Sequence, residues 1–235
     1  GSRAPETAAL ARAAIAILPE KERRLHSDDL PILPYILTGF DPSAPGEVSL
    51  PAGETARYFR NAGLVVMRSG FTPDDTYAAF KAGAKFKMHQ HYDENSFVIF
   101  RKGFQALDTG SRGSTPHHKV YYPQTVAHNG ILIRGGEEPL PNYWYPANAA
   151  PLPRDVRNDG GQNRQLAGRN LGFVSTAEYA ASAGDATGCY SDRKCREAIR
   201  FFVYVKPDYF IVYDRVKTVK PDQEKVFLLH SAGEP

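Results

Sequence analysis

The residues best suited to chemistry lie between His89 and Asp108. His89 and His91 stand one residue apart before an apolar run, Gly103 follows as a turn residue, and the next apolar run ends on Asp108. Side chains at positions i and i+2 of an extended segment share a face, so the two histidines can act side by side. A turn at Gly103 would return Asp108 to them, and a further histidine, His128, follows in a turn-like segment.

Histidine and carboxylate side chains on adjacent strands suit two kinds of chemistry. Together they ligate divalent metal ions such as zinc, and a neutral imidazole also takes up a proton near pH 7. With one histidine, Asp108 and His128 on a metal, the other histidine is left for acid–base work. Two alternatives stay open at this point: these residues are polar groups on surface strands, or His89 is a further ligand or a core histidine.

The composition favours an all-β protein and excludes several classes. The chain has 235 residues, 42% of them hydrophobic, with 20 Gly and 18 Pro, and helix formers are sparse after residue 25. No apolar run approaches the roughly 20 residues that cross a bilayer, and no signal peptide or long Lys/Arg run is visible. We therefore expect neither a membrane span nor a nucleic-acid partner. Cys189 and Cys195 form either a small disulfide or two free thiols.

Short apolar runs separated by turn residues begin near residue 55 and predict a large antiparallel β-sandwich. The predicted strands are Ala56–Arg60, Leu64–Ser69, Thr76–Ala82, Ser96–Arg101, Phe104–Asp108, Gly130–Arg134, Asn163–Leu166, Leu171–Thr176, Ile199–Lys206, Tyr209–Val216 and Lys225–His230. Pro207-Asp208 predicts a hairpin turn between two of them. Residues 109–127 and 135–162 are predicted to be long polar loops.

The N-terminal part has a different pattern. The spacing of apolar residues in 4–25 predicts a helix with an apolar stripe. Residues 26–53 are rich in Pro, Asp and Gly and are predicted to form a connector. We therefore divide the chain into residues 1–53, a terminal helix and connector, and residues 54–235, a β-sandwich domain. Gly1-Ser2 looks like a cloning remnant, and the sequence stops just after a strand-like run. We expect a piece of a longer protein, with most of a helical domain missing before it and the β-domain truncated at its C-terminus.

Motifs along residues 55–235 match those of a known family in order and spacing. They are Tyr58–Gly70, His89-x-His91-x-Asp93, Gly103-x-x-x-Leu107-Asp108, Tyr122-x-x-Thr125-x-Ala127-His128-Asn129, Tyr209–Val216 and Phe227–His230. In these motifs the chain resembles the heparinase II/III-like polysaccharide lyases. The resemblance implies an all-β domain, a large antiparallel β-sandwich, that follows an N-terminal α/α toroid. Only the last toroid helix, within residues 4–25, would be present here.

The resemblance also implies roles for particular residues. His91, Asp108 and His128 match the family's metal ligands, with Zn²⁺ as the usual and structural ion, and His89 matches its β-domain catalytic histidine. The substrate would be an acidic polysaccharide that contains uronic acid, such as heparin, heparan sulfate or alginate, cleaved by β-elimination in the periplasm or outside the cell. The family's catalytic tyrosine and a second histidine or asparagine belong to the toroid and have no counterpart here.

Loop residues and partners complete the expectation. Tyr122 and Arg112 are candidates for substrate binding, the latter as a charge donor to sugar carboxylates or sulfates. The helical domain is expected as a partner, in the same protein or as a second chain, and the 235 residues alone are expected to be weak or inactive.

Two other functions are compatible with the sequence. Gly83-x5-His89-x-His91-x2-Glu94 nearly matches the first cupin motif, although its histidine–glutamate gap is one residue short. In a cupin-like metalloenzyme, Glu94 and His89 would be ligands and Asp108 would not. The remaining alternative is a non-catalytic, metal-stabilised carbohydrate-binding domain.

Overall fold

The computed structural model of the protein describes residues 54–72, 74–84, 90–110, 120–135, 138–139, 141 and 157–233. The predicted helix within residues 4–25 and the connector at 26–53 lie outside them, as do His89 and Arg112. Apart from Glu54, the described residues belong to one unit, Thr55–Pro235. None of the helices among them is long and apolar enough to cross a membrane.

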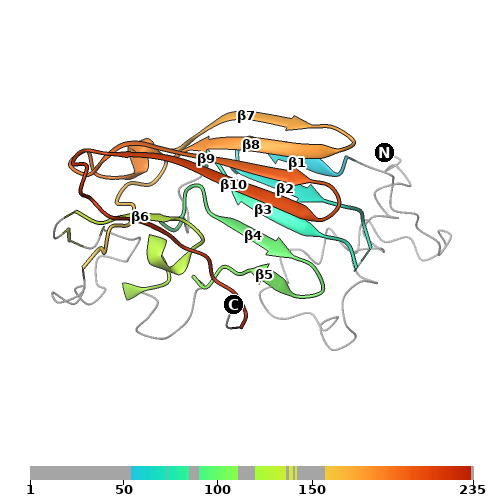
Figure 1. Ribbon diagram of the computed structural model, residues 1–235, viewed down its shortest axis with the longest axis horizontal. Helices are drawn as coiled ribbons and strands as arrows, with labels where there is room; N and C mark the ends of the chain where they lie inside the picture. Colours follow the sequence, from blue (N-terminus) through green and yellow to red (C-terminus); the bar gives the residue numbers. More distant parts are fainter. Residues whose placement is uncertain are drawn as a thin grey trace, which may run out of the picture. The chain divides into compact units, whose positions relative to one another are not determined.

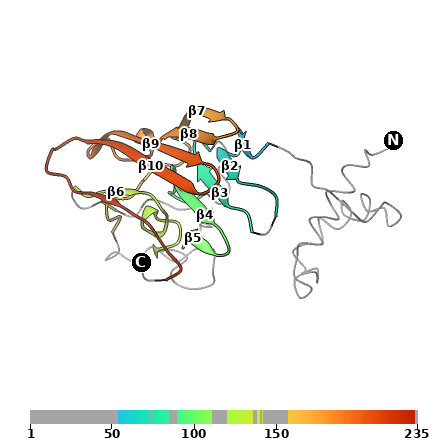
Figure 2. The ribbon, with the colours of Figure 1, turned by 45° about the vertical axis from the view of Figure 1, so that its right-hand side comes forward.

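Two antiparallel sheets form a sandwich, which confirms the predicted all-β fold. The five-stranded sheet follows the chain as β1 (Ala56–Phe59), β2 (Leu64–Arg68), β3 (Tyr77–Lys81), β4 (Phe97–Phe100) and β5 (Phe104–Ala106). The four-stranded sheet contains β7 (Arg169–Ser175), β8 (Tyr179–Asp185), β9 (Cys195–Val205) and β10 (Tyr209–Thr218), in the order β10-β9-β8-β7. Figures 1 and 2 show this second sheet lying across the first. A small third sheet pairs β6 (Ile131–Ile133) with β11 (Lys225–Phe227).

The main core lies between the two large sheets. Strands β2 and β3 bury every second residue, as expected for strands with one face against a core. Phe80 and Phe97 of the first sheet stack near Phe202 of the second, with ring centroids 5.3 and 5.1 Å apart. Met67 and Tyr204 belong to the same buried cluster. Burial of these apolar side chains holds the two sheets face to face.

A second buried cluster surrounds the two cysteines. Cys189 and Cys195 are free and buried among Ile131, Ile133 and Tyr190. Burial raises the pKa of the Cys195 thiol to about 11 and also raises the pKa of Cys189. Of the two sequence-based alternatives, the structure therefore has free thiols, and both are held in the unreactive protonated form at neutral pH.

Two of the strand assignments made from sequence need correction. The predicted strand Asn163–Leu166 is irregular, because the backbone N–H groups of Asn163 and Arg164 both donate to the Cys189 carbonyl, at 2.9 and 3.1 Å, instead of joining a ladder. Strand β8 gives no strand signal in the sequence, because it consists mainly of Ala, Ser and Gly and lacks, after Tyr179, the β-branched and aromatic residues that are enriched in strands. Small residues are needed there: a Cβ on Gly184 would lie 2.0 Å from Asn95 Oδ1.

Candidate functional site

A histidine–aspartate cluster forms where the β4–β5 hairpin meets the 3₁₀ helix η3 (Thr125–Ala127). Strand β5 runs back along β4, so Asp108 follows two residues after its end, as the turn at Gly103 predicted. His128 caps the C-terminal end of η3. The Nδ1 atom of His128 lies 2.9 Å from Asp108 Oδ1, and the rings of His91 and His128 lie 5.2 Å apart between centroids. Asp108 and His91, two of the residues predicted as metal ligands, therefore each lie beside the third, His128.

His128 is held at both ring nitrogens. Its side chain is 1% exposed; Nδ1 faces Asp108, and Nε2 lies 3.1 Å from the Tyr122 carbonyl oxygen. Burial opposes the charged form, but the hydrogen bond to Asp108 and the negative charge of Asp93 outweigh it, so the pKa of His128 is raised. Since both neighbouring groups are acceptors, this arrangement suits a ring protonated on both nitrogens.

His91 has the opposite electrostatics. Burial, and secondarily the nearby His128, lower its pKa to about 4 despite the favourable charges of Asp93 and Asp108. Its imidazole is therefore neutral at neutral pH, the form that ligates metals or accepts protons. The cluster thus contains one neutral and one readily protonated imidazole side by side.

Gly110 shows how tightly the cluster is packed. Its backbone N–H donates to Asp108 Oδ1 at 2.8 Å. A Cβ at this position would lie 2.3 Å from His128 Cε1 and 2.5 Å from the Tyr122 carbonyl oxygen. Because Gly110 has no Cβ, the backbone can approach the imidazole of His128 and hold the Asp108 carboxylate beside it.

The side chains of His91, Asp108 and His128 are of the types that bind zinc, but their positions do not group them around one ion. Two imidazoles and one carboxylate are suitable zinc ligands. Within the described ranges, however, no three His, Cys, Asp or Glu side chains are grouped closely enough to hold one ion. The three residues meet as two pairs that share His128, whose nitrogens are occupied by Asp108 and Tyr122. Metal binding would require His128 to exchange one of these hydrogen bonds for the ion.

The other predicted site residues are only partly described. Tyr122 contacts the cluster through its backbone carbonyl, while the Tyr121 hydroxyl lies 3.1 Å from Thr109 Oγ1. The substrate-binding role of the Tyr122 side chain stays a prediction. His89 and Arg112 fall outside the described residues, so their roles stay predictions as well.

Sequence reasoning gave no role to Asn129 and His230, which the structure brings to the cluster. The buried Asn129 amide donates to the carbonyl oxygens of Phe97 and Leu107, at 2.8 and 3.0 Å. Its Oδ1 accepts the backbone N–H of His230 at 2.7 Å. Asn129 therefore ties β4, β5 and the C-terminal segment together behind His128. The only sequence signal was their presence in two of the family motifs.

Glu94, the residue after Asp93, is a buried acid. Glu94 is 5% exposed; its carboxylate accepts the Gly83 N–H and packs so closely on Gly168 that a Cβ there would lie 2.3 Å from Glu94 Cδ. Burial raises the pKa of Glu94 to about 7; Asp93 adds to the rise, and Lys81 opposes it. Lys81 itself is paired with Asp93. In this position the Glu94 carboxylate is engaged by the Gly83 N–H, and it belongs to no group of three potential metal ligands within the described residues.

We expect Glu94→Gln to flatten the pH dependence of stability. Since the pKa of Glu94 is about 7 in the fold against 4.5 unperturbed, the folded state binds more protons between these values. The contribution of Glu94 to the free energy of unfolding is therefore highest at low pH, where Glu94 is protonated in both states, and it falls as the pH rises through 7. Glutamine retains an acceptor for Gly83 and should stabilise the protein above pH 7 by on the order of 3 kcal/mol.

Denaturant unfolding across the range from about pH 5 to 8 measures this effect. Glu54→Gln, at an exposed position, is the matched control and should leave the slope nearly unchanged. A Glu94→Gln variant with the wild-type pH slope would show that Glu94 is ionised throughout the range.

The fold and the cluster define an antiparallel β-sandwich domain with a histidine–aspartate centre at the edge of its five-stranded sheet. Residues 51–232 match the family model described as heparinase II/III-like, C-terminal, and the chain belongs to this family. The predicted resemblance is thereby confirmed. No curated protein matches the chain.

Solved structures of heparinases have a similar fold. The heparinase III described as the BT4657 gene product superimposes with a TM-score of 0.54 at 17% identity, covering 82% of this chain and 26% of that one. A second structure, described as heparinase III, gives a TM-score of 0.51 at 18% identity and covers 78% and 25%. The chain therefore spans about a quarter of the length of each of these proteins.

Proposed function

We propose that this chain is the β-sandwich domain of a polysaccharide lyase that cleaves an acidic, uronic-acid-containing polysaccharide by β-elimination. The observation that carries this proposal is the family match over residues 51–232. The histidine–aspartate cluster supports it, because its residues belong to the motifs on which the resemblance was based. A periplasmic or secreted location is part of the proposal, since such polysaccharides are extracellular.

The chemistry assigns separate roles to the side chains of this site. A base removes the proton at C5 of the uronic acid, the charge spreads onto the adjacent carboxylate, and the 4-linked oxygen leaves with a proton from an acid. His89 serves as that base or helps to stabilise the developing charge. Arg112 and Tyr122 bind the substrate, and a helical domain, in the same protein or a second chain, contributes the acid.

The products distinguish a lyase from other functions. β-Elimination leaves an unsaturated uronate that absorbs in the ultraviolet, whereas hydrolysis or binding alone does not. We expect a mixture of this chain with a helical domain of the family to generate that absorbance from heparan sulfate or alginate. Products without it would exclude a lyase, and full activity of the 235 residues alone would exclude the need for a helical partner.

We also propose that His91, Asp108 and His128 bind one Zn²⁺. When bound, the ion would supply a cross-link between the segment before β4, the end of β5 and the η3 turn. Support comes from the ligand chemistry of the three residues and from their proximity, with Asp108 and His91 both beside His128.

Asp108→Ala is expected to weaken zinc binding by at least about a hundredfold, more than is typical for loss of an outer-shell partner. Metal analysis after dialysis and a zinc titration measure this. Asp208→Ala is a matched control, because Asp208 and Asp108 are both 43% exposed and Asp208 pairs with Arg101, away from the histidines. Unchanged zinc stoichiometry in Asp108→Ala would contradict the assigned ligand set.

A further inference from the structure

The outer face of the four-stranded sheet has an apolar half and a charged half. Alternate residues of β8, β9 and β10 face away from the core, and at one end these are Tyr179, Phe201, Val203, Tyr209, Ile211 and Tyr213. Tyr209 is 71% exposed and Tyr213 58% exposed. A group of exposed aromatic and aliphatic side chains on one sheet face is typical of a binding surface.

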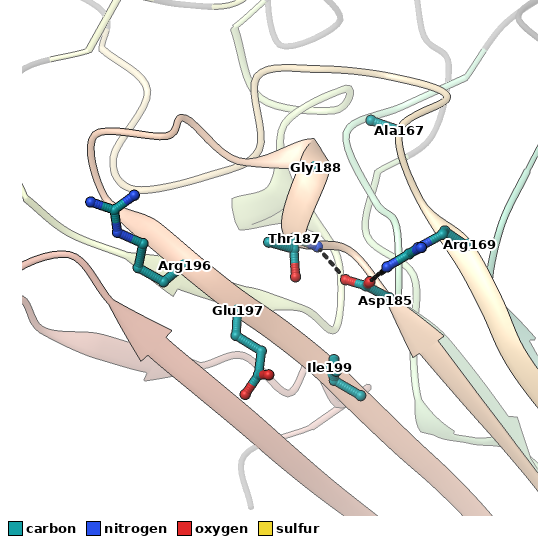
Figure 3. A pocket seen from close by; sticks show the side chains of 8 residues that line it. All are labelled: Ala167, Arg169, Asp185, Thr187, Gly188, Arg196, Glu197 and Ile199. Carbon is teal, nitrogen blue, oxygen red and sulfur yellow. Dashed lines mark hydrogen bonds and ion pairs between the residues drawn. The ribbon is translucent and has the colours of Figure 1, made fainter.

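The charged half contains a pocket of about 460 Å³. Its lining includes Arg169, Asp185, Thr187, Arg196, Glu197 and Ile199. Figure 3 shows Arg169 and Arg196 on opposite sides of Thr187, with Ile199 further along the same strand as Arg196. The volume is in the range of sites for small ligands. None of these residues belongs to the histidine–aspartate cluster.

The charges around this pocket leave a positive excess. Asp185 is paired with Arg169 at 2.6 Å, and Glu197 is shared by Arg215 and Lys217, at 2.8 and 3.3 Å. Arg196 is exposed, and within the described part of the chain it makes no ion pair; Asp192, whose charge also acts on it, is itself paired with Arg164. The rim of the pocket therefore carries the guanidinium of Arg196, which has no ion-pair partner of its own, and that of Arg169, which is 71% exposed despite its partner. Arginine suits sulfate and carboxylate groups because its planar fork donates two parallel hydrogen bonds.

The pocket and the aromatic residues are adjacent on the same sheet face. In the ladder register, Tyr213 pairs with Phe201, and two residues along each strand Arg215 pairs with Ile199. The neighbouring strand continues this second row, with Ile199 opposite Asp185. The Phe201 and Tyr213 rings lie 5.8 Å apart between centroids. A ligand with an anionic group in the pocket can therefore extend directly over an aromatic surface.

We propose that this outer face binds an anionic saccharide, with a sulfate or carboxylate at Arg196 and Arg169 and a sugar ring over Tyr213. The anionic part of the ligand follows from the excess positive charge. The sugar part rests on the proposed function, and flat aromatic rings suit the apolar face of a pyranose. The site would hold the polymer on a surface that shares no side chain with the histidine–aspartate cluster.

Calorimetric titration of the 235-residue chain with a heparin-derived hexasaccharide tests this proposal. Arg196→Ala should weaken binding about tenfold, the loss of one charge-assisted hydrogen-bonding group. Arg193→Ala removes the same charge from an exposed position three residues earlier and should change affinity by no more than about twofold. Tyr213→Ala should also weaken binding, whereas Phe104→Ala, at a similarly exposed ring on β5, should not.

Several results would overturn the proposal. Equal losses in Arg193→Ala and Arg196→Ala would show only general charge attraction, and no binding by the wild-type chain would exclude the site. A dimer in sedimentation that Tyr213→Ala dissociates would show that a second copy covers this face. Failure of the proposed lyase activity is distinguishable, because the titration requires no turnover. Arg196-dependent binding by the chain, combined with no ultraviolet-absorbing product when a helical domain is added, would reject the lyase and retain the saccharide site.

Discussion

Arg200→Ala is expected to lower the free energy of unfolding by about 3–5 kcal/mol, the usual cost of breaking a buried ion pair. The Arg200 side chain is 1% exposed, and its Nε and Nη2 donate to the two carboxylate oxygens of Asp214 at 2.7 and 2.9 Å. Its Nη1 donates to the carbonyl oxygens of Asn95 and Asn129 at 2.8 and 2.6 Å. Alanine would leave a carboxylate and two buried carbonyls without these donors.

Thermal and denaturant unfolding measure this loss, which corresponds to a fall in Tm of roughly 6–20 °C for a domain of this size. Arg215→Ala is the matched control, because Arg215 is on the neighbouring strand with a 48% exposed side chain and pairs with Glu197 on the outer face. Its removal should cost no more than about 1 kcal/mol. Arg200→Lys should recover only part of the loss, since an ammonium cannot form the two-pronged contact. Equal effects of Arg200→Ala and Arg215→Ala would show that the buried network contributes no more than a surface pair.

His89→Ala is expected to lower the rate of β-elimination by about 10²–10⁴-fold, the usual contribution of a general base. The ultraviolet-absorbing product formed by the chain together with the proposed helical domain measures this rate. The residue lies outside the described part of the chain, but Gln90 directly follows it, and His91 belongs to the cluster around His128. In the sequence His89 stands two residues before His91, and its role as the base is a prediction that rests on the family resemblance.

Two further measurements separate proton transfer from a structural role of His89. Added imidazole should restore part of the activity of His89→Ala if the missing group transfers a proton, and it should have no effect on a misfolded variant. His117→Ala, in the predicted polar loop, is the control and should retain activity within about twofold, as expected for a surface substitution. An active His89→Ala enzyme would remove this residue from the mechanism.

The strand pattern could be predicted where side chains alternate between core and solvent. β2 and β3 have this alternation, and so does the β9–β10 hairpin, whose turn at Pro207-Asp208 was anticipated. Strand β8 lacks a recognisable pattern because the crowded interior requires Ala, Ser and Gly on its inner face. Its strand conformation is imposed by its neighbours β7 and β9, which the local sequence does not reveal.

The histidine–aspartate cluster was predictable because it depends largely on local geometry. A hairpin returns Asp108 to the start of β4, and a nearby turn adds His128. The polar network around Arg200 could not be predicted in this way. It joins Arg200 to Asn129 and Asn95, which are 71 and 105 residues away in the sequence. Such contacts follow from how the two sheets pack, and one sequence contains no periodic signal for them.

The contacts of Asn129 have a consequence for the order in which the protein is completed during synthesis. His230 donates its backbone N–H to Asn129 and accepts the N–H of Leu107 through its carbonyl at 2.8 Å. The segments next to Asp108 and His128 thus gain supporting hydrogen bonds from a segment about a hundred residues later. On the ribosome, the histidine–aspartate centre would become fully ordered only after this segment has emerged, so shortened translation products would lack a finished site.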